Sequence, residues 1–352
     1  MKSRKRRVGL LLIIILMIFS IGCTNLKNDV VDNENMKVAY IVQKDTLDDK
    51  YLNELGYKGI KRAEIELGIN YEVLEGNIDK EEKLQKNLKK LAEKNELVII
   101  MGHQFNDITR EVAAGERDKK FIVIGGKVTE SNIQDIEFRS EEGSFLMGII
   151  AGRKSKTNNV AFIGTENDEN TERLLAGYSA GVKTTNPEAA KKLLSGENVS
   201  YIGNEIDIKK AKNIARQLYK DGVDIIFEDV GKSAEGVFKA AKLSGKYAIG
   251  MGMDKNIAYE DYNKNIISSM IIKVDEIVYK AIKDADEGVF KSGEVNSVSY
   301  GLKENFIDIA PSTEFDVEDE TYNLIIKYKN DIITEKINLP KNQNEVLEFK
   351  VE

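Results

Sequence analysis

From Met36 onward the chain alternates short apolar runs with longer segments in which apolar residues recur every three or four positions. The short runs, such as MKVAYIV at 36–42 and LVIIMG at 97–102, have the length and β-branched content of strands. Segment 52–67 instead places its apolar and small residues on one face of a helix, and Gly68 follows as a helix-ending residue. The pattern therefore predicts repeated strand and helix units.

The same periodicity extends over the rest of the chain. It predicts further strands at 69–75, 121–126, 133–138, 159–164, 199–203, 223–229, 246–252 and 266–272. It predicts helices at 79–93, 105–114, 141–153, 170–184, 208–221, 233–244 and 274–287, followed by a β-leaning tail with NSVSYGL, NLIIKYK and DIITEKI. Apolar strands without strict alternation are typical of parallel strands covered by helices on both faces. We therefore expect two doubly wound α/β lobes, whose ligand lies at the carboxyl ends of the strands.

The start of the chain differs from this pattern. Residues 1–22 hold five basic residues and then an apolar run at 8–21, which predicts a secretory signal peptide too short to span a membrane. A lone cysteine, Cys23, follows directly, and this arrangement resembles a bacterial lipobox, although Ser20 stands where that motif usually has Leu. We expect Cys23 to carry the lipid that anchors the protein to the outer face of the cell membrane, with 23–35 as a flexible tether. An ordinary signal peptide, or an uncleaved anchor with an incidental cysteine, is the alternative.

Composition excludes several classes of function. Without the first 22 residues, 47 Lys and Arg stand against 59 Asp and Glu, a net charge of −12 that repels nucleic-acid phosphate. One Cys and one His rule out a disulfide framework and a multi-His or Cys-rich metal site. No nucleophile, base and acid series accompanies the histidine. We therefore expect no nucleic-acid partner, no cofactor, no metal and no enzyme activity.

Several segments together resemble one known family. DDKYLNELGYKGIKRAEIELGI at 48–69 is similar to a stretch of the basic-membrane-protein family, substrate-binding lipoproteins that act as purine-nucleoside receptors of ABC importers. Further segments resemble that family in the same order, at 137–152, 158–187, 222–250, 266–284 and 300–311. The resemblance covers nearly the whole chain.

This resemblance implies a type I periplasmic-binding-protein fold with three crossovers between lobes, near 139, 255 and 292. Lobe 1 would comprise 36–139 and 256–291, and lobe 2 would comprise 140–255 and 292–352. It also implies a small-molecule ligand held between the lobes and an ABC importer permease as partner. We expect a monomer.

The family's ligand contacts fall on altered residues in this chain. Its two nucleobase-stacking rings correspond to Leu52 and Glu205, and its ribose-binding Asp and its Lys correspond to Gly252 and Ile272. We therefore expect purine nucleosides to bind weakly or not at all. Residues at or beside these positions are expected to contact the ligand instead, namely Tyr51, Asp207, Asp254 and Lys273.

Other candidate contacts follow predicted strands. Asp49 and Asn53 follow the first strand and are either ligand contacts or ordinary helix caps. His103 and Phe105 follow the strand at 97–102. Glu228, Asp229 and Lys232 follow the strand residues 223–227 and either contact the ligand or form a solvated loop and helix cap. The expected cleft lining is 43–53, 103–105, 138–142, 165–169, 204–207, 228–232 and 251–254.

Two functions remain open on the sequence alone. The preferred one is an extracytoplasmic solute-binding lipoprotein that closes on a small polar molecule and presents it to an importer. The alternative is a regulatory or sensor lipoprotein of the same fold with an altered pocket, because a branch of the family linked to competence regulation also carries a Gly-His pair like that at Gly102 and His103.

Overall fold

The structure, a computed structural model, describes residues 35–293 and 297–351. The predicted signal peptide at 1–22, Cys23 and all but the last residue of the predicted tether at 23–35 lie outside these residues. Within them, no helix is both long enough and apolar enough to cross a membrane.

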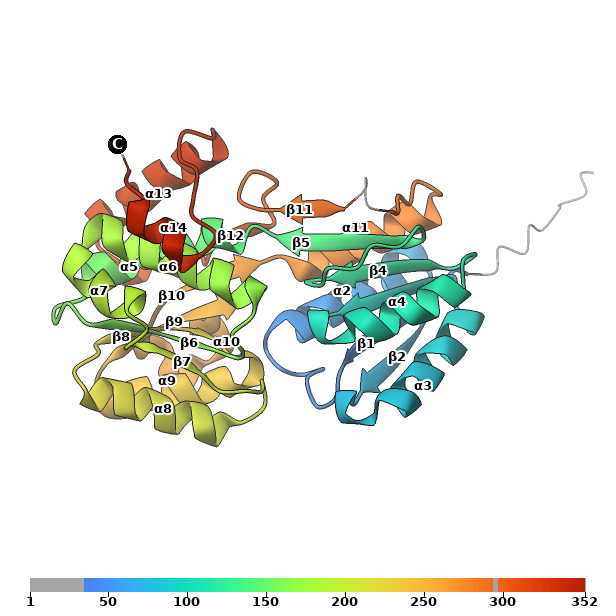
Figure 1. The fold of residues 1–352 in the computed structure, drawn as a ribbon, viewed down its shortest axis with the longest axis horizontal. Helices are drawn as coiled ribbons and strands as arrows, with labels where there is room; N and C mark the ends of the chain where they lie inside the picture. Colours follow the sequence, from blue (N-terminus) through green and yellow to red (C-terminus); the bar gives the residue numbers. More distant parts are fainter. Residues whose placement is uncertain (1–34, 294–296, 352) are drawn as a thin grey trace, which may run out of the picture. The chain divides into compact units, whose positions relative to one another are not determined.

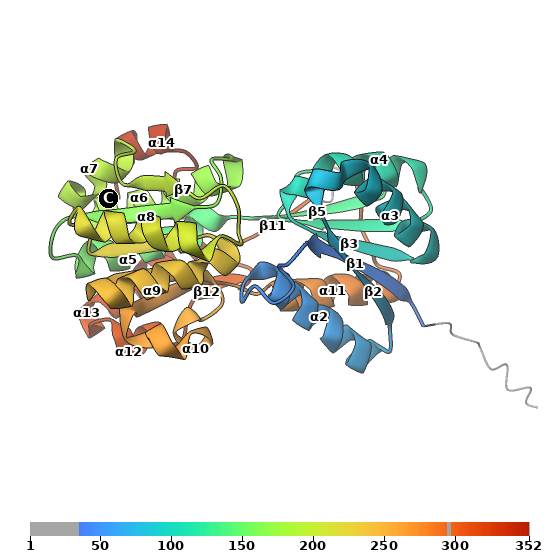
Figure 2. The same ribbon diagram turned by 90° about the horizontal axis from the view of Figure 1, so that it is seen from below.

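The first lobe is built on a parallel sheet with the strand order β11-β5-β4-β3-β1-β2. Its strands are β1 (Lys37–Gln43), β2 (Asn70–Gly76), β3 (Leu97–Met101), β4 (Lys120–Ile124), β5 (Ile133–Phe138) and β11 (Val298–Tyr300). Helices α2 (Leu52–Leu67) and α11 (Val274–Asp286) cover one face, and α3 (Glu81–Lys94) and α4 (Asn106–Gly115) cover the other (Figure 2).

Burial along β1 explains why the first strands do not alternate apolar and polar residues. Tyr40 packs in the core on the side of α2, whereas its neighbour Ile41 packs in the core with α3 and α4. Both side chains are fully buried, because the sheet is covered on both faces. Gly59 on α2 lets α11 approach, since a Cβ there would lie 2.5 Å from the Asp275 carbonyl oxygen.

The second lobe contains a sheet with the strand order β12-β10-β9-β8-β6-β7. Its strands are β6 (Val160–Gly164), β7 (Val199–Tyr201), β8 (Ile225–Asp229), β9 (Tyr247–Gly252), β10 (Ile266–Ile272) and β12 (Ile307–Ile309), of which β12 is antiparallel to β10. Helices α5 (Ser140–Lys154) and α6 (Glu169–Thr185) lie on one face, with α8 (Ile208–Lys220) and α9 (Ala234–Ser244) on the other (Figure 1). These two α/β lobes confirm the predicted fold class.

Strand pairing places two segments differently from the sequence prediction. The prediction assigns 256–291 to lobe 1, but β10 pairs with β9 in the second sheet, where Met270 packs against Gly143 of α5. It assigns 292–352 to lobe 2, but β11 pairs with β5 in the first sheet. The chain therefore crosses between lobes near 139, 273 and 301.

The predicted β-leaning tail is wrong over NLIIKYK and DIITEKI, which form α13 (Asp319–Ile333) and its end. The buried residues Thr321, Ile325, Tyr328 and Ile332 recur every three or four positions, and the Tyr328 ring lies 5.5 Å from the Phe145 ring of α5. Four shorter helices were not predicted, namely α7 (Pro187–Leu194), α10 (Lys255–Ala258), α12 (Thr313–Asp316) and α14 (Gln343–Glu348).

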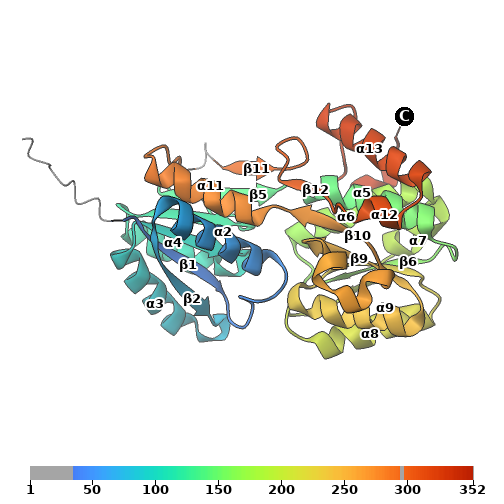
Figure 3. The ribbon, with the colours of Figure 1, turned by 180° about the vertical axis from the view of Figure 1, so that it is seen from behind.

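The three crossovers are hydrogen-bonded side by side, and the segment at 299–306 bonds to both of the others. The Arg139 guanidinium donates to the Glu142 carboxylate at 2.5 Å and to the Ser299 carbonyl oxygen at 2.6 Å, and it also pairs with Glu304. The backbone N–H of Lys273 donates to the Phe306 carbonyl oxygen at 2.9 Å. These bonds make one connected hinge between the lobes, which Figure 3 shows from behind.

Candidate ligand-binding site

A pocket of about 540 Å³ lies between the lobes and is lined from both sides. Residues at or just after the carboxyl ends of β1 to β5 and of β6 to β9 contribute to it. Parallel strands in two such sheets direct their carboxyl ends toward one crevice, so the fold itself forms this pocket. Its volume falls within the range of roughly 300–1,000 Å³ typical of small-molecule sites.

The loop after β1 is held by a buried carboxylate. Asp49 accepts hydrogen bonds from the backbone N–H groups of Tyr51 at 2.7 Å and Glu54 at 3.1 Å. It also accepts from the Asn53 amide at 2.9 Å. Burial is the main cause that raises the pKa of the Asp49 carboxyl. Asp49 therefore fixes the start of α2, and Asn53 and Tyr51 face the pocket from that start.

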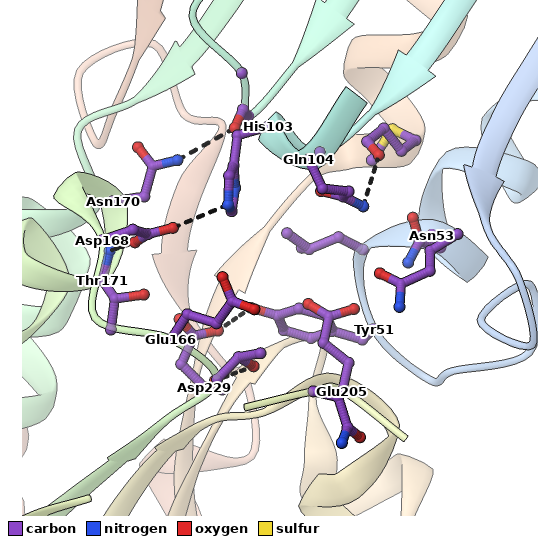
Figure 4. Close-up of a pocket in the computed structure, with 18 of the residues that line it drawn as sticks. Tyr51, Asn53, His103, Gln104, Glu166, Asp168, Asn170, Thr171, Glu205 and Asp229 are labelled. Carbon is purple, nitrogen blue, oxygen red and sulfur yellow. Dashed lines mark hydrogen bonds and ion pairs between the residues drawn. The ribbon is translucent and has the colours of Figure 1, made fainter. Parts of the chain in front are cut away.

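Tyr51 reaches from the first lobe to the second. Its hydroxyl donates to the carboxylate of Asp229, the last residue of β8 (Figure 4). Its ring rests on Gly252, where φ is +93° and a Cβ would lie 2.6 Å from the ring atom Cδ2. The position therefore needs glycine both for its left-handed backbone and for the space the ring occupies.

Glu205 faces the pocket from the loop after β7. Its carbonyl oxygen accepts from the Ser233 backbone N–H at 2.9 Å. Its side chain lies against Gly231, where a Cβ would be 2.8 Å from the Glu205 Cβ. Among the residues that the structure describes, its carboxylate has no hydrogen-bond or ion-pair partner. Burial, with the nearby charges of Asp49, Asp229 and Glu166, raises the pKa of Glu205 to about 8.

Two further carboxylates end β8. Burial raises the pKa of Asp229 to about 6, although the hydrogen bond from Tyr51 acts in the opposite direction. Glu228 is fully buried and accepts from the backbone N–H groups of Val230 and Met251, each at 3.2 Å. Burial raises the pKa of Glu228 to about 8, and the charge of Lys255 lowers it. Only Asp229 of the pair lines the pocket.

His103 links the lobes on the opposite side of the pocket. It follows β3 after a turn at Gly102, where φ is +98°. Its Nε2 lies 3.1 Å from the Asp168 carboxylate, which also caps α6 by accepting from the Thr171 backbone N–H at 2.8 Å. The Asn170 amide donates to the Gly125 carbonyl oxygen at 3.2 Å beside this contact.

A second set of bonds crosses beside Tyr51. Buried Lys255 donates to the Lys50 carbonyl oxygen at 2.6 Å, and Lys50 in turn donates to the Ala258 carbonyl oxygen at 2.9 Å. Asp48 and Lys232 form an ion pair at 2.6 Å. The loop after β1 is thus joined to α10 and to the turn after β8 by bonds between the lobes.

Four of the candidate residues predicted from sequence line the pocket together, namely Tyr51, Asn53, His103 and Asp229. Three of the positions where the family's contacts are altered also line it, namely Leu52, Glu205 and Ile272. The fourth, Gly252, lies beneath the Tyr51 ring.

The other candidates do not line the pocket. Asp49 and Lys232 hold the loop after β1, as described above. Phe105 is 1% exposed and packs in the core with α3 and α4. Asp207 caps α8 by accepting from the Lys210 backbone N–H at 2.8 Å.

Two more of these candidates have structural contacts elsewhere. Asp254 caps α10 and accepts from the Ser312 hydroxyl at 2.8 Å. Lys273 lies in the hinge, where its backbone joins Phe306.

The predicted lining missed two whole strand ends, Gly76 to Asp79 and Ile124 to Gly126. Both segments are at or directly after the ends of strands that were predicted, β2 and β4. The rule that ligands lie at carboxyl strand ends would have included them had it been applied to every strand. The predicted lining also missed the start of α6 and several single residues, namely Met101, Gly102, Glu137, Asn170, Thr171, Leu174, Gly203 and Ile272.

The profile of the Bmp family, described as ABC transporter substrate-binding protein PnrA-like, matches residues 36–343. The chain belongs to this family. It is 29% identical over 350 residues to basic membrane protein A1 of Borrelia garinii subsp. bavariensis, covering 97% of this chain and 98% of that one. It is 24% identical to the ABC transporter nucleoside-binding protein BmpA of Lactococcus lactis subsp. cremoris, covering 87% and 89% of the two chains.

A solved structure has the same fold. An ABC transporter solute-binding protein from Aeropyrum pernix superposes with a TM-score of 0.74 at 20% identity, covering 89% of this chain and 96% of that one. The Bmp family thus comprises extracytoplasmic substrate-binding proteins of ABC transporters rather than enzymes, as the resemblance implied.

Proposed function

We propose that this protein holds a small polar organic molecule in the pocket between its lobes and presents it to an ABC importer, while a lipid on Cys23 keeps it at the membrane. The observation that supports this most is that one pocket is lined by strand ends of both lobes. Bonds between the lobes surround the same pocket at Tyr51 and at His103.

The proposed mechanism of binding is closure of the two lobes around the ligand. A ligand that touches both lobes stabilises the closed state by its higher affinity for that state, and the importer distinguishes closed from open. The hinge around Arg139 keeps the crossovers together while the lobes turn. The ligand would add its own contacts to both lobes to the interlobe bonds at Tyr51 and His103.

Thermal-shift screening of the purified protein against nucleosides, bases, sugars and amino compounds tests this function. A ligand of the folded state raises the melting temperature by mass action. The substitution Asn53→Ala should abolish or reduce that rise, and Asn213→Ala, on the outer helix α8, serves as the control. The proposal fails if no compound shifts the melting temperature, or if Asn53→Ala leaves the shift of every ligand unchanged.

The lipid anchor is tested separately. Metabolic labelling with a fatty-acid analogue should mark the protein but not its Cys23→Ala variant. Equal labelling of both would contradict lipidation at Cys23.

A further inference from the structure

The charged groups of the pocket are mostly acidic. Lys44 and His103 are the only basic residues among those that line it in the described part of the chain. The acidic ones are Asp45, Asp79, Glu137, Glu166, Asp168, Glu205 and Asp229.

Most of the basic groups nearby are already paired. Lys44 lies 3.2 Å from Asp45 at the rim, and His103 lies against Asp168. Arg173, which does not line the pocket, lies 3.6 Å from Glu137. None of these basic residues forms an ion pair with Glu205 or Asp229, which lie by the Tyr51 ring (Figure 4).

The two carboxylates by Tyr51 differ from the rest of the acidic lining. Asp229 accepts a hydrogen bond from a neutral phenol, and Glu205 accepts none from any described residue. Lys255 is the buried cation of this region, but its ammonium group donates to the Lys50 carbonyl oxygen and forms no ion pair with a described carboxylate. Neither carboxylate has an ion-pair partner among the described residues, and both are half-buried in the pocket lining. A positive charge placed between them would pair with both in a partly enclosed site.

We infer that the ligand carries a protonated amine or amidine that pairs with Glu205 and Asp229. This inference rests on the proposed function and specifies the chemistry of its ligand. The apolar part of such a molecule would lie against Leu52, Phe138 and Ile272, which line the same pocket.

The chemistry of the lining favours an organic cation over a metal ion. No group of three or more His, Cys, Asp or Glu among the described residues is arranged to hold a metal. The pocket of about 540 Å³ also has room for an organic molecule larger than a hydrated ion.

Matched pairs of compounds that differ in one charged group test the inference. We would titrate 1,4-diaminobutane against 1,4-butanediol, glucosamine against glucose, and 5′-amino-5′-deoxyadenosine against adenosine, by calorimetry at pH 8. In at least one pair the amine should bind about ten times more tightly than its hydroxyl counterpart. The variants Glu205→Gln and Asp229→Asn should each reduce that preference to less than about three-fold.

The control variant is Glu314→Gln, because Glu314 is exposed and lies outside the pocket lining. It should leave the preference unchanged, and circular dichroism should show that all three variants are folded. The inference is overturned if no amine binds, if every hydroxyl compound binds at least as tightly as its amine, or if Glu205→Gln and Asp229→Asn both retain the preference.

Different results would overturn the proposed function and the inference of an amine ligand. If a neutral compound from the wider screen binds and loses affinity on Asn53→Ala, the proposed function stands and only the amine inference falls. If no compound of either set binds, both fall.

Discussion

At the scale of single residues, the pocket is defined by two positions whose roles depend on the fold. Gly252 admits the Tyr51 ring, and Glu205 presents an unpaired carboxylate. The sequence indicates that both lie after strands, and it shows that a stacking ring of the family is absent at Glu205. It does not reveal that Tyr51 rests on Gly252, because that contact joins two lobes. Nor does it decide that Asp49 holds the loop after β1, or that Asp207 and Asp254 cap helices.

Glu205 should make the ligand-free protein less stable as pH rises. Its folded-state pKa of about 8 lies above the ordinary value of 4.5. Its contribution to stability is therefore fully present below about pH 4.5 and is lost as pH rises toward 8. Urea unfolding between pH 5 and 9 should show this decline in the free energy of unfolding. In Glu205→Gln the free energy should fall less steeply with pH, and the difference in slope should correspond to at most about one bound proton per molecule. The same slope in both proteins would contradict the burial of an ionisable Glu205.

Purine nucleosides should bind more weakly than micromolar. Leu52 and Glu205 provide no ring at the two expected stacking positions, and a lost stacking ring costs about 1–3 kcal/mol. The Tyr51 ring does not replace them freely, since Gly252 covers part of it and its hydroxyl binds Asp229. Calorimetry with adenosine, guanosine and inosine measures this directly. A sub-micromolar dissociation constant for any of them would refute it.

At the scale of elements, periodicity predicted well where a strand or helix is long and buried, as for β1, α2 and β10. It failed for α13, whose run of apolar and β-branched residues resembles a strand although its buried positions follow a helical period. It could not assign β11 to a sheet, because its partner β5 is distant in sequence. It misplaced β10, which pairs with the preceding strand β9, because the chain crosses between lobes after β10 and not before it. The strand ends, and hence most of the pocket, were predictable because their position depends only on strand order and direction.

The α5 and α6 pair should be sensitive to any side chain at Gly148. A Cβ there would lie 2.2 Å from the Tyr178 carbonyl oxygen, and backbone cannot move aside easily. We expect Gly148→Ala to lower the free energy of unfolding by about 1–3 kcal/mol. Gly115→Ala is the matched control, because its Cβ would meet nothing within 4 Å. Urea denaturation of both variants gives the comparison, and equal stabilities would contradict the close packing of these helices.

At the scale of the whole described chain, a few interlobe bonds lie around the pocket, and fully buried Lys255 makes one of them. Its ammonium group donates to Lys50 on the other lobe, whereas Lys242 donates to the Asp261 carbonyl oxygen within its own lobe. A hydrogen bond from a charged group contributes roughly 1.5–3 kcal/mol. Lys255→Met should therefore weaken binding of any ligand that closes the lobes by about ten-fold or more.

Calorimetry with the tightest ligand of the screen measures the effect of Lys255→Met. The control Lys242→Met removes an ammonium group whose contact lies inside one lobe. Its affinity for the ligand should stay within about two-fold of that of the unsubstituted protein. Unchanged affinity in Lys255→Met would show that closure does not depend on this bond.

The central claim is that a ligand bound between the lobes closes them. The most direct test is the distance between spin labels on exposed Lys89 of α3 and exposed Lys239 of α9, one on each lobe, each introduced as cysteine with Cys23 replaced. Without ligand we expect a broad distance distribution that includes open states, and with saturating ligand a single narrow distance. An identical distribution with and without a ligand that raises the melting temperature would contradict the claim.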